Sequence, residues 1–223
     1  MTFAILGRCP KTAQVGVALA TSSIAVGARC PWAWAGVGTV ATQNVTDPSL
    51  GPRVLDLMER GLEPQAALAE LAGEPNIEHR QLLAIDIEGR TAVYSGAATL
   101  GVHATAEGRD CCAGGNLLAN TDVPSAMTAA FEAATGALAE RLLAALAAGL
   151  AAGGEAGDIH SAAMVVADKA AWPYADLRID WTDADPVAEL ALLWAAYAPQ
   201  AEAYVTRALD PGKAPSYNVP GEE

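Results

Sequence analysis

Short runs of aliphatic and β-branched residues alternate along the chain with longer stretches whose apolar positions recur at helical spacing. Runs of the first kind are bounded by Gly, Pro, Asn or Ser, as is typical of β-strands. They predict strands at 3–8, 14–23, 36–43, 80–89, 90–96, 161–168 and 175–181, with a further strand or strand end at 111–120. Turn residues predict hairpins between the first and second strands and, at Glu88 and Gly89, between the fourth and fifth.

Helices are predicted between these groups of strands. Asp47 or Ser49 caps the first helix, and Gly61 ends it. A second, short helix begins at Glu63. Further helices are predicted over 123–134 and 135–152, and residues 185–210 form one helix or a pair of helices. Paired strands with helices between the pairs indicate mostly antiparallel sheets covered by helices, which is an α+β class. We expect a single domain over 1–210, followed by an extended arm over 211–223.

Composition excludes several classes of protein. The 223 residues are 52% hydrophobic, which supports a sizeable core, and 26 acidic residues against 13 basic ones give a net charge of −13. No basic face is available for phosphates, so neither nucleic acid nor an anionic membrane is expected as a partner. The longest apolar run, 142–154, is shorter than the roughly 20 residues that a bilayer span needs. The N-terminus lacks the pattern of a secretion signal, and the four cysteines show no metal-binding spacing, so we expect a cytoplasmic protein.

The familiar catalytic motifs are absent from the sequence, and the candidate chemistry begins at Thr2. No GxSxG, P-loop, HExxH or GxGxxG segment occurs. Thr2 stands directly before the first predicted strand, where removal of Met1 would expose its α-amine. An α-amine has a pKa of about 7.7–8.0, so near neutral pH it can accept the proton of a hydroxyl on the same residue. Position alone is weak evidence, because every chain has a second residue.

Other polar residues stand at the ends of predicted strands or in loops. Asn116 follows two glycines and could offer its amide, with their backbone N–H groups, to a developing oxyanion; the alternative is a turn or a β-bulge. The remaining candidates are either substrate-binding and supporting residues or ordinary turn and ion-pair residues: Ser22, Ser23, Gln43, Asn44 and Arg80.

A set of segments resembles, in order, family 1028 of the domains of unknown function. The segments are MTFAILGR, GVALATSS, GARCPWAWAGVGTVATQ, the pair Arg80-Gln81, GNLL, GALAERLLAALAAG, GGEAGDIHSAAM, DLRID and DPVAEL. That family is grouped with the N-terminal-nucleophile (Ntn) hydrolases. The resemblance therefore implies two stacked antiparallel sheets between helical layers, an α-β-β-α sandwich, with Thr2 as the nucleophile.

The chain departs from the family pattern near two expected site positions. Where many Thr-nucleophile enzymes of this type have a lysine, this chain offers Arg29, which stays charged and cannot shuttle a proton. The loop GGEAGDIHSAA carries Glu155, Asp158 and His160 where we would expect Asp, Gly and Gln. These differences imply altered polarity in that loop.

Three hypotheses about function follow. The leading one is an Ntn-type amidohydrolase that cleaves an amide, ureido or related acyl bond of a small molecule, with Thr2 as nucleophile and no cofactor or metal. The alternative is a non-catalytic Ntn-like scaffold that binds a small ligand or mediates oligomerisation, and we expect a homo-oligomer in either case. The third, a metal-dependent hydrolase, would use His160, Asp158 and Glu155 as ligands.

Overall fold

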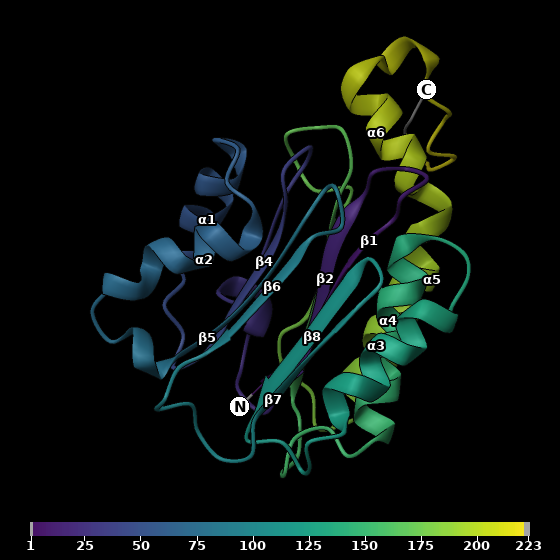
Figure 1. The fold of residues 1–223 in the computed structure, drawn as a ribbon. Helices are drawn as coiled ribbons and strands as arrows, with labels where there is room; N and C mark the ends of the chain where they lie inside the picture. Colours follow the sequence, from purple (N-terminus) through teal and green to yellow (C-terminus); the bar gives the residue numbers. More distant parts are fainter. Residues whose placement is uncertain (1, 221–223) are drawn as a thin grey trace.

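Two antiparallel sheets form the centre of the computed structural model, which describes residues 2–220 (Figure 1). The six-stranded sheet has the order β10-β9-β2-β1-β8-β7 and the four-stranded sheet the order β3-β4-β5-β6. The strands of the larger sheet are β1 Thr2–Arg8, β2 Val15–Thr21, β7 Ala104–Gly108, β8 Cys111–Asn116, β9 Ser161–Ala167 and β10 Ala175–Ile179. Those of the smaller sheet are β3 Pro31–Trp34, β4 Gly38–Asn44, β5 Arg80–Asp86 and β6 Thr91–Ser95.

Helices cover the outer face of each sheet. The α-helices are α1 Leu50–Glu59, α2 Pro64–Ala69, α3 Val123–Ala133, α4 Leu138–Ala151, α5 Pro186–Tyr197 and α6 Ala201–Leu209. Short 3-10 turns lie at Val26–Ala28, Glu70–Gly73, Ile77–His79, Ala198–Gln200 and Pro211–Lys213. Figure 1 shows α1 and α2 on one side of the stacked sheets and α3, α4 and α5 on the other.

Strand alternation divides the core into three apolar layers. In β1, Phe3 and Ile5 pack toward α3 and α4, whereas Ala4 and Leu6 pack toward the four-stranded sheet. A third layer fills the space between the four-stranded sheet and helices α1 and α2. The expected α+β class with two antiparallel sheets and helices is therefore confirmed, and the layers run helix, sheet, sheet, helix.

The sequence pattern missed two strands, β3 and β7, and its element limits needed correction elsewhere. The predicted 111–120 strand ends at Asn116, and the predicted 135–152 helix begins only at Leu138. Residues 185–210 form the pair α5 and α6, joined by a 3-10 turn. Ser49, not Asp47, is the residue that directly precedes α1. The Ser49 hydroxyl donates a hydrogen bond to the Asp47 carboxylate.

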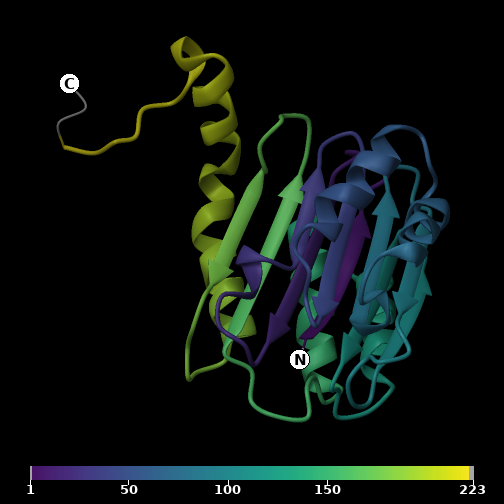
Figure 2. The same cartoon turned by 90° about the vertical axis from the view of Figure 1, so that its left-hand side faces the viewer.

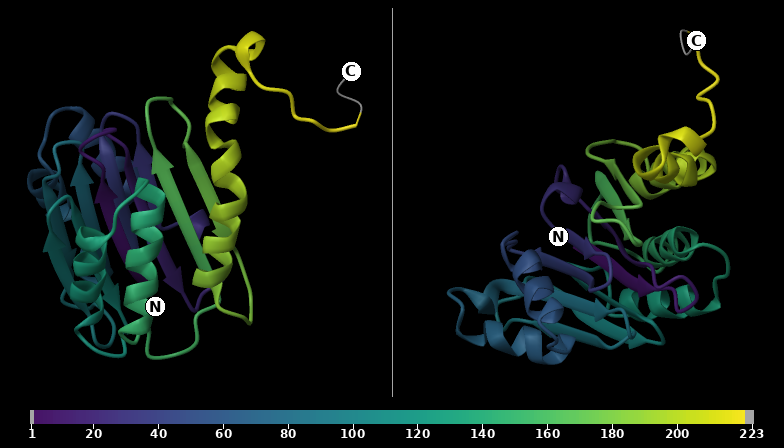
Figure 3. Two further views of the ribbon diagram at one scale, coloured as in Figure 1. Left: turned by 90° about the vertical axis from the view of Figure 1, so that its right-hand side faces the viewer. Right: turned by 90° about the horizontal axis from the view of Figure 1, so that it is seen from above.

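The C-terminal segment extends away from the layers. In Figures 2 and 3, α6 projects beyond the sheets and the chain after it runs outward. Only Ala201 of α6 is buried. The Arg207 guanidinium donates to the Pro215 carbonyl at 2.9 Å and lies 3.7 Å from the centre of the Tyr217 ring. No helix within residues 2–220 combines the length and apolarity needed to cross a bilayer.

Candidate functional site

Six strands place a polar residue at the same end of the space between the two sheets. Each of these residues continues the alternation that carries its strand's apolar side chains into the layer between the sheets. All six are buried, and we call them the polar ring: Thr2, Thr21, Asn116 and Ser161 from the larger sheet, and Gln43 and Gln81 from the smaller one. Register pairs them as Thr2 with Asn116, Thr21 with Ser161, and Gln43 with Gln81.

Gln81 is the hub of the hydrogen bonds in this ring. Its Nε2 donates to the Gly115 carbonyl at 3.0 Å and to Ser95 Oγ at 2.9 Å. Its Oε1 accepts from Gln43 Nε2 at 2.8 Å and from Asn116 Nδ2 at 3.1 Å. Because the backbone carbonyl can only accept, the orientation of all three amides is determined by this network.

The network leaves two buried acceptors facing the layer between the sheets. Asn116 Oδ1 and Gln43 Oε1 have no donor among the residues that the structure describes. A buried polar atom without a hydrogen bond costs about 1–3 kcal/mol. Such a cost at two members of one hydrogen-bond network indicates that these polar groups are held for another purpose than stability.

Thr2 is the first residue of β1, a strand that lies between β2 and β8 in the middle of the larger sheet. Thr2 is buried, with 4% of the residue exposed. It shares the inner face of the sheet with Asn116, its partner across β8. The predicted nucleophile and the predicted oxyanion donor are therefore neighbours.

The glycines before Asn116 do not take the place that we expected. Gly114 and Gly115 lie inside β8, which is paired on one side with β1 and on the other with β7. The segment is regular strand, so the alternative of a turn or bulge is wrong. Because the backbone of both glycines is paired with β1 and β7, their N–H groups are not available to an oxyanion. Asn116 Nδ2 is the donor that remains of the three proposed ones.

Glu155 belongs to a loop that closes the end of the larger sheet across the start of β1. It forms an isolated bridge with Leu118 beyond β8, and its carboxylate accepts the Ser22 N–H beyond β2 at 3.1 and 3.2 Å. The loop also donates from Ala156 to Leu117 and from His160 to Thr21. Glu155 is 5% exposed, and burial raises its pKa, against the lowering effect of the Ser22 hydrogen bonds.

The two predicted serines organise the turn after β2. Ser23 donates its N–H to Thr21 Oγ1 at 3.2 Å, and its carbonyl accepts from Ser161 Oγ at 2.6 Å. Ser22 donates to Glu155, as described above. Arg29 donates to the carbonyls of Ile24 at 2.6 Å and Ala25 at 3.0 Å. Its guanidinium therefore holds the same loop through two backbone carbonyls.

Asn44 and Arg80 hold loops beside the smaller sheet. Asn44 donates to the His79 carbonyl at 2.5 Å and accepts the Leu100 N–H at 3.2 Å. The Arg80 guanidinium donates to the Val45 carbonyl. These contacts stabilise backbone turns, and none of them reaches the polar ring.

His160 stacks on Trp181, with ring centres 4.3 Å apart, and its Nδ1 lies 2.9 Å from the Thr182 carbonyl. Together with Glu155 and Asp158 it lines a surface cavity of about 390 Å³. Nowhere in residues 2–220 do three His, Cys, Asp or Glu side chains group as a metal site. The three proposed ligands thus share a cavity without forming a ligand set.

Sequence reasoning missed three members of the polar ring. Gln81 enters the sequence analysis only through the resemblance, and neither Thr21 nor Ser161 is a candidate there. The alternation of side chains along a strand could have identified them. Each of these residues lies two positions from a buried apolar residue and therefore shares the inner face of its strand.

Comparisons with known proteins place this chain in a family. The model of a family of unknown function, DUF1028, matches residues 2–190. A crystal structure of a Silicibacter pomeroyi protein of the same family has 32% sequence identity and a TM-score of 0.83, over 88% of this chain and 86% of its own. Anbu (ancestral beta-subunit) from Yersinia bercovieri has 10% identity and a TM-score of 0.38, over 97% of this chain and 100% of its own. No curated protein matches. Because the family model spans most of the sequence, the chain belongs to the DUF1028 family.

Proposed function

We propose that the protein is an Ntn-type amidohydrolase that cleaves an amide, ureido or related acyl bond with Thr2 as its nucleophile. One observation carries the proposal: Thr2 begins a central strand and presents its side chain to a buried polar ring between two stacked sheets. The sequence of layers, helix, sheet, sheet, helix, is the arrangement that the Ntn resemblance implies. The mechanism requires removal of Met1, which lies outside the described residues.

The α-amine of Thr2 is the general base of this mechanism. It takes the hydroxyl proton as the oxygen attacks the acyl carbon, and it returns a proton to the leaving nitrogen when the carbon–nitrogen bond breaks. Water then hydrolyses the ester on Thr2. The chain has only three lysines, and the Arg29 guanidinium donates to two backbone carbonyls. We therefore assign the role of general base to the Thr2 amine and not to a side chain. The buried Glu155 carboxylate, at the end of the sheet where β1 begins, would stabilise the ammonium that forms when the amine has accepted the hydroxyl proton.

Asn116 is the proposed donor to the tetrahedral oxyanion. One N–H of its amide donates to Gln81, and the second has no acceptor among residues 2–220. A single well-placed donor contributes about 10²–10³-fold to the rate. Gln81 acts through Asn116 and is a positioning residue.

The test combines intact mass with turnover. A mass that lacks Met1, activity on a panel of small amide and ureido compounds, a loss of at least about 10³-fold in Thr2→Ala and partial retention in Thr2→Ser would support the proposal. Thr12→Ala, at an exposed turn, is the matched control. Retention of Met1, or equal turnover by wild type and Thr2→Ala, would overturn it.

The alternative, a non-catalytic scaffold that binds a small ligand or mediates oligomerisation, is favoured by the mostly exposed residues that follow α6. Ligand binding without turnover, unchanged in Thr2→Ala, would establish it.

Two further properties belong to the proposal. All four cysteines are free, which fits a reducing compartment, so we propose the cytoplasm. The exposed chain after α6 supports a homo-oligomer, which light scattering at several concentrations tests directly.

A further inference from the structure

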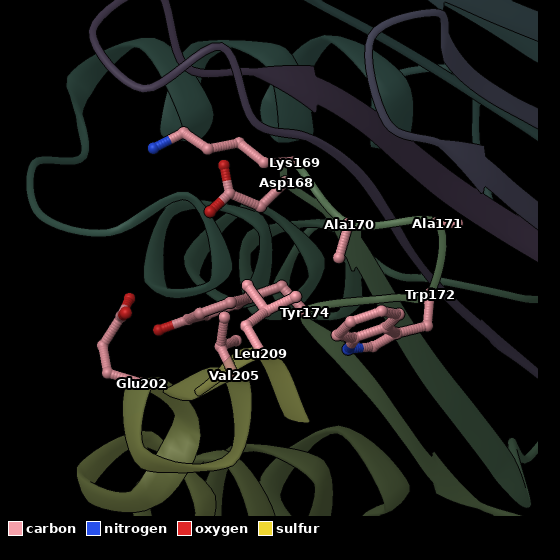
Figure 4. Close-up of a pocket in the computed structure, with 9 residues that line it drawn as sticks. All are labelled: Asp168, Lys169, Ala170, Ala171, Trp172, Tyr174, Glu202, Val205 and Leu209. Atoms are coloured by element: carbon pink, nitrogen blue, oxygen red, sulfur yellow. The ribbon is translucent and has the colours of Figure 1, made fainter. Parts of the chain in front are cut away.

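A second cavity has a volume of about 400 Å³. Figure 4 shows the residues that line it. It is formed between the loop that joins β9 to β10 and helix α6. β9 begins at Ser161 in the polar ring and ends at Ala167, beside the cavity. Seven extended residues span about 20 Å, so the two places are at opposite ends of the strand. None of the proposed catalytic residues lines this cavity.

One end of the cavity is apolar. Trp172 stands on the loop, and Val205 and Leu209, one turn apart, lie on the facing side of α6. Trp172 is 43% and Leu209 67% exposed. Exposed large apolar side chains gathered around a concavity are typical of a binding site rather than of an ordinary surface.

The other end carries charge. Asp168 comes from the loop and Glu202 from α6, and the Tyr174 hydroxyl points toward Glu202 (Figure 4). Neither carboxylate has an ion-pair partner within 4 Å in the described part of the chain. Burial and the Glu202 charge raise the pKa of Tyr174 to about 12, so its hydroxyl stays neutral.

Lys169 balances only one of the two carboxylates. Its ammonium extends away from Trp172, at the end of the cavity where Asp168 and Glu202 lie (Figure 4). With two carboxylates and one ammonium, the lining keeps one excess negative charge. The net charge of −13 of the whole chain also attracts cations to the surface.

We propose that this cavity binds an amphipathic organic cation, an aryl- or alkylammonium. Its ammonium lies between Asp168 and Glu202, and its apolar body packs on Trp172 and Leu209. Carboxylates satisfy the charge and the N–H donors, while an aromatic face attracts a cation and covers the hydrocarbon part. The binding involves no covalent step and does not depend on Thr2.

The probe is phenethylammonium, titrated by calorimetry and by the change in tryptophan fluorescence. 2-Phenylethanol and 3-phenylpropionate have a similar ring and chain with a neutral or negative end. We expect saturable binding of the cation, at least about tenfold weaker binding of the alcohol, and no binding of the anion. High salt should weaken the binding of the cation.

Variants assign the binding to this cavity. Glu202→Gln and, independently, Asp168→Asn should each weaken binding by about tenfold, because each removes a charge-assisted hydrogen bond. Glu70→Gln, a surface change in the 3-10 turn after α2, and Thr2→Ala should leave it unchanged. Equal affinity for the alcohol, or undiminished binding by both carboxylate variants when circular dichroism shows them folded, would overturn the proposal. Failure of the Thr2 mechanism would leave these results unaffected.

Discussion

Replacing Gln81 by methionine tests whether the polar ring is a connected network. The side chain is fully buried and makes four hydrogen bonds, which methionine cannot make although it fills a similar volume. Gln43 keeps its bond to the Gly114 carbonyl, and the half-buried Ser95 can turn to water. The Asn116 amide, in contrast, loses its only acceptor in the described chain.

The magnitude follows from these bonds. A stranded buried amide costs about 1–3 kcal/mol, and each of the other lost bonds costs about 0.5–1.5 kcal/mol net. The apolar methionine offsets part of this cost, which leaves an expected loss of about 2–6 kcal/mol in the free energy of unfolding.

Urea unfolding followed by circular dichroism measures this loss as a lower midpoint with an unchanged m-value. Gln65→Met, at an exposed position of α2, should stay within about 0.5 kcal/mol of wild type. In a double-mutant cycle with Asn116→Ala, the two changes should couple by at least about 1 kcal/mol. A Gln81→Met protein within about 1 kcal/mol of wild type would refute the network.

Three further predictions concern stability. Burial raises the pKa of Glu155 in the folded protein, so the protein should lose stability as the pH rises from about 4.5 through that pKa. Glu155→Gln should flatten this part of the pH–stability curve. A variant curve of wild-type shape would contradict the raised pKa of Glu155. Gly51→Ala should cost about 1–3 kcal/mol by urea unfolding, because a Cβ there would lie 2.0 Å from the Trp32 ring, whereas Gly73→Ala, with open space around it, should not destabilise; equal effects would be contrary to the packing. Asp185→Ala should lower the melting temperature through a loss of about 0.5–2 kcal/mol, because its side chain caps two N–H groups of α5, and an unchanged melting temperature would argue against the cap.

Most of the fold follows from local pattern, and the exceptions share a cause. The missed strands β3 and β7 are edge strands, each paired on one side only. β3 begins with Pro31 and reads as a loop before bulky tryptophans, and β7 has only partly buried and exposed residues. Edge strands need less apolar alternation than central ones, so the signal that revealed the other strands was weak here.

The candidate site was only partly predictable from the sequence. The local sequence shows that a polar residue ends a strand, but it does not show which residues of other strands lie beside it. The structure brings Thr2, Asn116 and Gln43 to one end of the sandwich, with Glu155 in the loop that closes it. Ser22, Ser23 and Arg29 serve the adjacent turn; Asn44, Arg80 and His160 hold other loops. In the sequence, both groups are polar residues at or near strand ends. Only the stacking of the two sheets shows which of them face the space between the sheets.

The same stacking couples the proposed chemistry to the core. Thr2 and Asn116 belong to the larger sheet, whereas Gln43 and Gln81 belong to the smaller one and reach across to the carbonyls of β8. A slide of one sheet over the other by one residue, about 3.3 Å, would carry both amides out of hydrogen-bond range of these carbonyls. The apolar layer between the sheets therefore fixes the positions of Gln43 and Gln81 relative to Thr2 and Asn116. Core substitutions in that layer should alter activity before they unfold the protein.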